Sequence, residues 1–354
     1  MSTNILKICQ SAENGLRITP KEALALWKEG DIYTLGKTAN VIREKKATPG
    51  VVSYTVFRII NYTDICSIDC SFCSFKHKAS EIGGYVLSEA EILEKVGESY
   101  KQDCLQVFFQ GGVNPSIPME YYTGILSKIH EKFPGVHIRA FSPIEVLVMA
   151  KTFHKSVDAV LDELIEAGLQ SFPGAGAEIL TDRMRHILSD KKASPAEWFE
   201  TMKVALSKGL KGSTNIVWGS AETPEEIIEH LSMIRRLQDE TGNVVSFVPW
   251  TFQQQTKDFP IRHVNNMEYL KMVALARIFF DNIPNIETSL MVKGKEAGEM
   301  ALHFGANDIN SPVIEEKVLR SYGLKSAAEA ESFIQQSGFS PLRRNLNYEP
   351  GKKS

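Results

Sequence analysis

The chain of 354 residues has few cysteines, no long apolar run and no excess of charge of either sign. Lys and Arg number 40 against 43 Asp and Glu, a net charge of -3, and no basic cluster is long enough to indicate nucleic-acid or membrane-surface binding. No segment approaches the roughly 18 apolar residues of a membrane span. The first residues lack the charged start and apolar run of a secretion signal. We therefore expect a cytoplasmic protein that binds neither nucleic acid nor membranes.

Only five cysteines are present, and three of them stand together in the stretch CSIDCSFCSF (66–75). A reducing compartment disfavours structural disulfides, so this CxxxCxxC cluster is interpreted as metal binding or redox chemistry. The other two stand apart. Cys104 opens the apolar run CLQVFF, and it and Cys9 are expected to be buried core thiols.

Helix starts recur along the chain as Ser or Thr followed three residues later by Glu, the capping box that satisfies unpaired backbone N–H groups. These boxes are TPKE (19–22), SEAE (88–91), SPIE (142–145), SPAE (194–197) and TPEE (223–226). Apolar residues behind the boxes follow helical spacing, and glycines are predicted to end helices at Gly135, Gly168, Gly209 and Gly242.

Short β-prone runs alternate with these helices about six times. They are 53–62, 104–112, 136–141, 169–174, 212–219 and 244–250, with two further strands expected near 287–290 and 301–308. Connections too long for hairpins favour parallel strands joined by right-handed crossovers. The pattern predicts an α/β fold, a (β/α) TIM-type barrel, complete or partial. A doubly wound open sheet is the alternative, because alternation alone does not show whether the sheet closes.

Three regions are expected. Residues 1–50 form an N-terminal helical segment, residues 51–312 the barrel, and residues 313–354 a C-terminal helical extension with a polar tail.

The cysteine loop directly follows the first predicted strand, at the end of the barrel where catalytic residues gather. Three thiolates can hold three irons of a 4Fe-4S cluster and leave the fourth iron open, whereas a structural cluster would want a fourth cysteine. The alternative is a closed zinc site made of Cys66, Cys70, Cys73 and His77.

The CxxxCxxC loop with an aromatic residue before its last cysteine resembles the signature of the radical S-adenosylmethionine (radical SAM) enzymes. Further blocks resemble the group of that family that acts in futalosine-dependent menaquinone synthesis and in deazaflavin synthesis. They are INYTDIC, FFQGGVNP, RAFSPIE, FPGAGAEIL, DRMRHILSDKKASPAEW, IRRLQDETG, FVPWTFQ, HFGAND and PLRRNLNYE, and they span about Asn61 to Tyr348. Within the group, PWTFQ (249–253) is more similar to the enzyme that cyclises dehypoxanthine futalosine than to aminofutalosine synthase.

The resemblance implies a 4Fe-4S cluster held by Cys66, Cys70 and Cys73, with S-adenosylmethionine at the open iron. It further implies cofactor contacts from residues near the cysteine loop and the ends of the next strands: Phe72, Gln110, Gly111, Gly112, Ser142 and Glu178. Three of these residues have structural alternatives. The glycines suit a tight turn, and Ser142 suits a helix cap.

The resemblance also implies the reaction. A 5'-deoxyadenosyl radical would take hydrogen from the ribose C4' of dehypoxanthine futalosine, and the carbon radical would close onto the benzoate ring. The substrate carboxylate would be held by Arg58 or Arg139, unless these face outward, and Trp250 and Phe252 would wall the ring. The expected partners are this small molecule and a low-potential electron donor such as flavodoxin or ferredoxin.

The chain departs from the group's pattern at Ala175, Ser220, 310–312 and the run QQQT (253–256). None of these positions is in the cysteine loop, so the radical chemistry is expected to hold. All lie near the expected substrate mouth, which leaves aminofutalosine synthase or another enzyme of the group as alternatives. A different class is a non-catalytic zinc or iron-sulfur protein.

Overall fold

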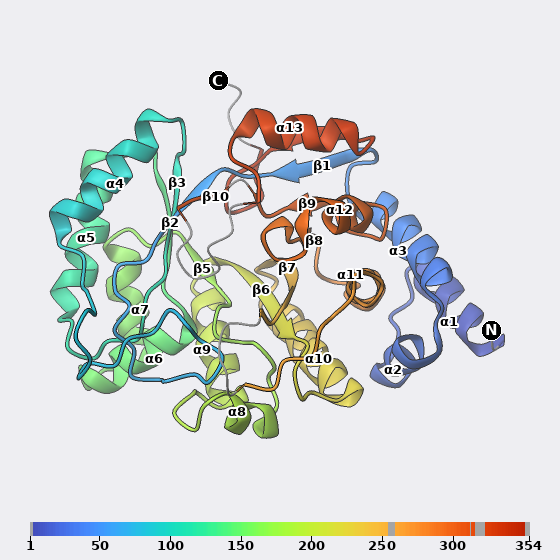
Figure 1. Cartoon of the computed structure of the whole chain (residues 1–354), viewed down its shortest axis with the longest axis horizontal. Coiled ribbons are helices and arrows are strands. Elements are labelled where there is room, and N and C mark those ends of the chain that lie inside the picture. Colours follow the sequence, from blue (N-terminus) through green and yellow to red (C-terminus); the bar gives the residue numbers. More distant parts are fainter. Residues whose placement is uncertain (1–2, 254–258, 312, 316–322, 351–354) are drawn as a thin grey trace.

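Parallel strands form one curled sheet with helices on its outer side (Figure 1). The computed structural model describes residues 3–253, 259–311, 313–315 and 323–350. In order across the sheet, the strands are β10 (Val313–Ile314), β2 (Phe57–Ile60), β3 (Gln106–Phe109), β4 (His137–Ala140), β5 (Ser171–Pro173), β6 (Lys211–Trp218), β7 (Val244–Thr251), β8 (Asn285–Thr288), β9 (Asp308–Ile309), β1 (Val51–Tyr54) and β11 (Ser340–Arg343).

The strands that lie one in from each end of this order, β2 and β1, come from neighbouring pieces of chain. Only Thr55 and Val56 separate β1 from β2. On one side, β9 pairs with both β8 and β1, while β10 pairs with β2. The sheet therefore curls round on itself, with the short strands β9 and β10 at its seam. The predicted TIM-type architecture is confirmed.

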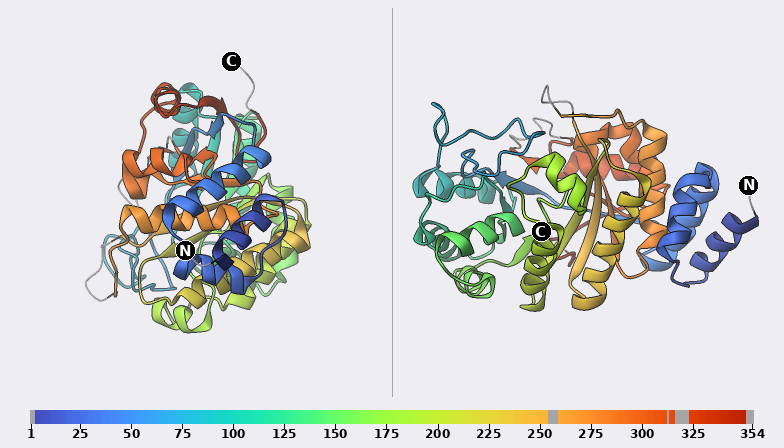
Figure 2. Two further views of the ribbon diagram at one scale, coloured as in Figure 1. Left: turned by 90° about the vertical axis from the view of Figure 1, so that its right-hand side faces the viewer. Right: turned by 90° about the horizontal axis from the view of Figure 1, so that it is seen from below.

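Helices cover the outside of the sheet. They are α1 (Thr3–Glu13), α2 (Pro20–Glu29), α3 (Ile32–Lys46), α4 (Glu89–Lys101), α5 (Met119–Lys132), α6 (Pro143–Thr152), α7 (Val157–Glu166), α8 (Asp182–Leu188), α9 (Pro195–Ser207), α10 (Pro224–Thr241), α11 (Asn266–Phe279), α12 (Leu290–Leu302) and α13 (Ala327–Gln336). Among these described helices, none combines the length and apolar composition needed to cross a membrane. The N-terminal helices α1 to α3 pack beside α11 (Figure 2).

The five predicted capping boxes are all formed, each with both of its reciprocal hydrogen bonds. The strand predictions need correction in four places. The run 53–62, expected as one strand, forms β1 and β2, and β10 was not predicted. The stretch 301–308 is not a strand, because α12 runs to Leu302 and only Asp308 at its end belongs to β9. Strand β11 was not predicted; its side chains are at most half-buried, so it lacks the apolar pattern of a core strand.

The segment 344–349 runs from the end of β11 and contacts side chains of the barrel interior. Arg344 and Asp308 form a buried ion pair, with 2.6 Å between Nη2 and Oδ1. Arg344 also donates to the Tyr348 hydroxyl at 2.9 Å and lies over its ring. These contacts fix the segment against β9.

We predict that Arg344→Met lowers the free energy of unfolding by about 3–5 kcal/mol, because it leaves the buried Asp308 carboxylate without its cation. Arg343→Met is the control, since Arg343 pairs with the exposed Asp103 and its loss should cost about 1 kcal/mol or less. Urea unfolding of the two variants measures the difference, and equal midpoints would contradict the prediction.

Candidate active site

The barrel interior opens into a cavity at the carboxyl ends of the strands. The cavity and its mouth hold about 1300 Å³ of empty space. It brings together seven of the residues predicted from the sequence: Phe72, Cys73, Gln110, Arg139, Glu178, Trp250 and Phe252. Their elements range from the loop after β2 to β7, so convergence of parallel strand ends creates the site.

Backbone hydrogen bonds hold the cysteine loop in place. Cys66 N–H donates to the His77 carbonyl at 2.9 Å, and His77 N–H donates to the Asp64 carbonyl at 2.8 Å. Ser71 N–H donates to the carbonyl of Leu188, at the end of α8, at 2.9 Å. The loop is therefore anchored at its two ends and in the middle.

A buried cation lies against one of the three thiols. The Lys192 ammonium is 3.8 Å from Cys70 Sγ and 2.9 Å from Glu178 Oε2. Burial raises the pKa of Cys70 to about 11, and Lys192 counteracts that rise. Burial would lower the pKa of Lys192, but Cys70 and Glu178 raise it on balance. Lys192 therefore stays charged and favours a thiolate beside it.

The three thiols suit a cluster better than a single ion. In the part of the chain that the structure describes, no three His, Cys, Asp or Glu side chains converge as a single metal ion requires. His77, the fourth ligand of the alternative zinc site, instead places Nδ1 2.7 Å from Asp64 Oδ2. A 4Fe-4S cluster takes each thiolate on a different iron, so Cys66, Cys70 and Cys73 fit it without converging on one point.

Arg185 has unused donors beside this loop. Its side chain is 4% exposed, and Nε and Nη2 have no partner among the described residues, while Nη1 donates to the Gly176 carbonyl at 2.8 Å. Glu178 lies beside it with a backbone φ of +37°, which is rare for a residue with a side chain. Unpartnered guanidinium donors fit an anionic group such as the carboxylate of S-adenosylmethionine.

The glycines after β3 are needed for close packing. A Cβ on Gly112 would lie 2.3 Å from the Ile65 carbonyl oxygen, and a Cβ on Gly111 would lie 2.8 Å from the Tyr62 ring. Neither glycine lines the described cavity, and nor does Ser142, which caps α6. The close packing of the two glycines and the cap formed by Ser142 fit the structural alternatives, a tight turn and a helix cap.

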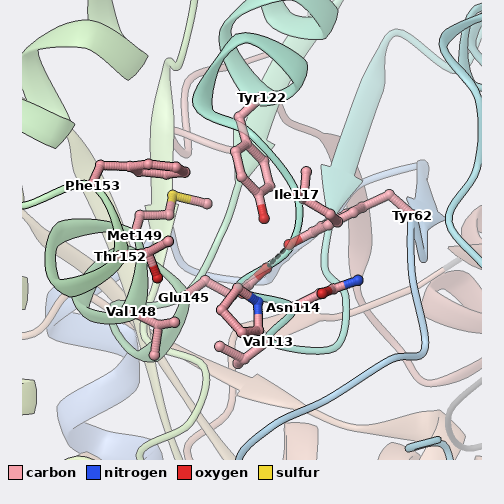
Figure 3. A pocket seen from close by; sticks show the side chains of 11 residues that line it. Tyr62, Val113, Asn114, Ile117, Tyr122, Glu145, Val148, Met149, Thr152 and Phe153 are labelled. Carbon is pink, nitrogen blue, oxygen red and sulfur yellow. Dashed lines mark hydrogen bonds between the residues drawn. The ribbon is translucent and has the colours of Figure 1, made fainter. Parts of the chain in front are cut away.

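Glu145, on α6, lines a small pocket together with Tyr62 (Figure 3). It accepts hydrogen bonds from the Tyr62 hydroxyl at 2.5 Å and from Ser142 N–H at 2.7 Å. Burial raises its pKa to about 7, and these donors partly offset the rise. The Glu145 carboxyl group therefore stays protonated up to a higher pH than an exposed glutamate does.

Arg58 faces away from the cavity, contrary to its proposed role as a carboxylate ligand. Strand alternation turns Phe57 and Ile59 inward and Arg58 outward, where it pairs with Glu315 at 2.6 Å and Glu98 at 2.8 Å. Arg139 is thus the predicted arginine that the structure brings to the cavity.

Several site residues were not predicted individually: Arg185, Lys192, Asn215 and Glu287. Arg185 and Lys192 lie within the block DRMRHILSDKK, which marked the region but gave no role to either residue. Of the departures noted above, Ala175 and Asn310 line the cavity, whereas Ser220 bonds the Pro260 carbonyl. Pro312 and 254–256 lie outside the described residues.

Comparisons with known proteins agree with this geometry. The family model "Radical SAM superfamily" matches residues 60–234, and "CofH/MqnC C-terminal region" matches residues 241–354. The chain is 36% identical to cyclic dehypoxanthine futalosine synthase of Halalkalibacterium halodurans, over 97% of this chain and 94% of that protein.

Two further comparisons concern an enzyme with a different name and a solved structure. The chain is 35% identical to 5-amino-6-(D-ribitylamino)uracil–L-tyrosine 4-hydroxyphenyl transferase of Archaeoglobus fulgidus, over 89% of this chain and 93% of that protein. Its fold is similar to the crystal structure of HydG, a maturase of FeFe-hydrogenase, with a TM-score of 0.78 at 17% identity, covering 98% and 77% of the two chains.

We predict that Cys66→Ala, Cys70→Ala and Cys73→Ala each reduce iron bound after anaerobic reconstitution to about a tenth or less, because each removes a ligand of the cluster. Cys9→Ala is the matched control, since Cys9 is buried in the core and should leave iron content unchanged. Iron analysis and the visible absorbance measure the effect. Full iron loading in the Cys70 variant would contradict it.

We predict that Glu145 makes the protein less stable as pH rises from about 4.5 to about 7. A carboxyl whose pKa is raised by folding contributes stability below its unfolded pKa and loses it as pH rises through the folded value. The loss is on the order of 3 kcal/mol, and Glu145→Gln should abolish it.

Urea unfolding of the wild type and Glu145→Gln at several pH values checks this prediction. Glu22→Gln makes the same change in the capping box of α2 and controls for the effect of this change on a capping box. If the difference in stability between the wild type and Glu145→Gln did not vary with pH, the prediction would be wrong.

Proposed function

Since the chain belongs to the radical SAM superfamily, and within it to the CofH/MqnC group, we propose that it converts dehypoxanthine futalosine to cyclic dehypoxanthine futalosine in menaquinone synthesis. The observation that carries this proposal is the 36% identity, over nearly the whole of both chains, to an enzyme named for that product. The cavity adds support, because it offers a cation and aromatic walls to an aryl carboxylate.

Radical SAM enzymes use a 4Fe-4S cluster and S-adenosylmethionine, a small substrate and a reductant. When bound, these cofactors supply a 5'-deoxyadenosyl radical that takes a hydrogen atom from the ribose C4'. The protein's task is then to hold the benzoate ring near C4' and to keep water away from the radical.

Arg139 is the proposed anchor for the substrate carboxylate. Its side chain is buried in β4, and among the described residues it forms no ion pair. Nη2 donates to the Leu346 carbonyl at 2.9 Å, but Nε and Nη1 reach serine hydroxyls only at 3.4 Å. Burial lowers its pKa to about 10, so it remains charged at neutral pH. A carboxylate would replace two long hydrogen bonds with charge-assisted ones.

Aromatic side chains wall the cavity. Phe72, Phe252 and Phe259 form a cluster with ring centroids 4.8 to 5.8 Å apart beside the cysteine loop. Trp250 lines the cavity, and its indole Nε1 has no partner among the described residues. We propose that the cluster excludes water and that Trp250 contributes an apolar face and one donor to the ligand.

The direct test uses anaerobically reconstituted protein with S-adenosylmethionine, a low-potential reductant and dehypoxanthine futalosine. We expect substrate-dependent 5'-deoxyadenosine and a product lighter by two hydrogens. If 5'-deoxyadenosine formed while the substrate mass stayed unchanged, the proposal would be refuted.

A second candidate function follows from the 35% identity to the tyrosine 4-hydroxyphenyl transferase, together with the departures at Ala175 and Asn310 in the cavity wall. Parallel reactions with L-tyrosine and 5-amino-6-(D-ribitylamino)uracil distinguish the two. Turnover of this pair alone would assign the chain to the second activity.

We predict that Arg139→Met raises the KM for dehypoxanthine futalosine about 10- to 100-fold, since a charged hydrogen bond contributes about 1.5–3 kcal/mol. Arg58→Met, an outward-facing control, should leave KM within about twofold. Steady-state kinetics measure both variants. A KM for Arg139→Met equal to that of the wild type would exclude Arg139 as the anchor.

A further inference from the structure

Glu287 is a buried carboxylate on β8 that lines the cavity, and only one of its oxygens is used by the protein. Oε1 accepts hydrogen bonds from the Ser246 hydroxyl and the Tyr348 hydroxyl, each at 2.5 Å. Among the described residues, no donor bonds Oε2 and no cation pairs with the carboxylate within 4 Å. Burying a carboxylate is costly, so a second oxygen left for the cavity points to a role toward the ligand.

The other carboxylate of the described cavity wall is already occupied. Glu178 pairs with Lys192 at 2.9 Å and with Arg185 at 3.4 Å, beside the cysteine loop. Glu287 is therefore the acidic side chain of that wall that can accept a proton from a bound substrate without breaking an ion pair.

Glu287 lies across the barrel from the proposed carboxylate anchor. Strands β5, β6 and β7 separate β4 from β8 in the sheet. Arg139 on β4 and Glu287 on β8 nevertheless interact electrostatically. Because both residues line one cavity, a ligand whose carboxylate binds Arg139 shares that cavity with Glu287.

The segment 344–349 forms hydrogen bonds with both Arg139 and Glu287. The Leu346 carbonyl accepts from Arg139, and the Tyr348 hydroxyl donates to Glu287. Arg344 fixes Tyr348 through its own hydrogen bond and its ion pair with Asp308. The segment therefore fixes the positions of the Arg139 guanidinium and the Glu287 carboxylate relative to each other.

We propose that Glu287 is the catalytic base that removes the proton from the ring carbon that has formed the new bond, and that Tyr348 is its positioning residue. The inference rests on the proposed function. When the C4' radical has added to the ring, that carbon carries both the new C–C bond and a hydrogen. Its C–H bond breaks, the proton goes to Glu287 Oε2, and one electron goes to the oxidised form of a flavodoxin- or ferredoxin-type carrier. Aromaticity is thereby restored, and the substrate has lost two hydrogens in total.

The test compares Glu287→Gln and Tyr348→Phe with the wild type, with Glu299→Gln on the exposed surface of α12 as the control. Each reconstituted protein is loaded with dehypoxanthine futalosine, and cyclic product and 5'-deoxyadenosine are quantified together. Iron content and thermal unfolding verify that each variant folds and binds its cluster. The ratio of product to 5'-deoxyadenosine isolates the step after hydrogen abstraction.

We expect this ratio to fall at least about tenfold in Glu287→Gln, since general bases contribute about 10²- to 10⁴-fold to a step. Tyr348→Phe should lower it by about two- to fivefold, and Glu299→Gln should match the wild type. An unchanged ratio in Glu287→Gln, or a parallel loss of both products, would overturn the assignment of the base. An unchanged ratio in Tyr348→Phe would overturn the positioning role. A wild-type protein that leaves dehypoxanthine futalosine untouched would instead refute the proposed function, and the inference with it.

Discussion

Parallel pairing of the strands across the curled sheet is the constraint on which the site depends. Because every strand runs in the same direction, the loops after β2, β3, β5 and β7 all emerge at one end. The cysteine loop, the glycines after β3 and Glu178 meet there although they are far apart in the sequence. The seam depends on two-residue strands, and the ion pair of Arg344 with Asp308 reinforces it from the segment after β11.

Charge is divided into two zones within this cavity. At the mouth, Lys192 and Arg185 surround Glu178 and Cys70, and unpartnered donors suit anionic groups of a cofactor. Elsewhere in the same cavity wall, Arg139 and Glu287 each form a hydrogen bond with the segment 344–349. The phenylalanines by the cysteine loop pack together and lower the local polarity. Such a division suits a site in which one group of residues binds the cofactor and the other binds the proposed substrate.

Local sequence signals predicted much of the fold. The capping boxes located five helices because their hydrogen bonds form within four residues, and the spacing of Cys66, Cys70 and Cys73 located the cluster loop for the same reason. Strand β11 and the direction of Arg58 could not be predicted in this way. Both depend on which distant segment covers which face of the sheet. The role of Glu287 could not be predicted either, because it depends on Tyr348, which bonds Glu287 across 61 residues of sequence, and on Arg139, which lines the same cavity.

The central claim is that the loop 66–73 holds a 4Fe-4S cluster with one iron open to S-adenosylmethionine at the cavity mouth. Electron paramagnetic resonance of the reduced, reconstituted protein, recorded with and without S-adenosylmethionine, tests it most directly. We predict the spectrum of a single reduced cluster whose g-values change when S-adenosylmethionine is added, because the ligand binds the open iron. A cluster spectrum that does not respond to S-adenosylmethionine would contradict the account.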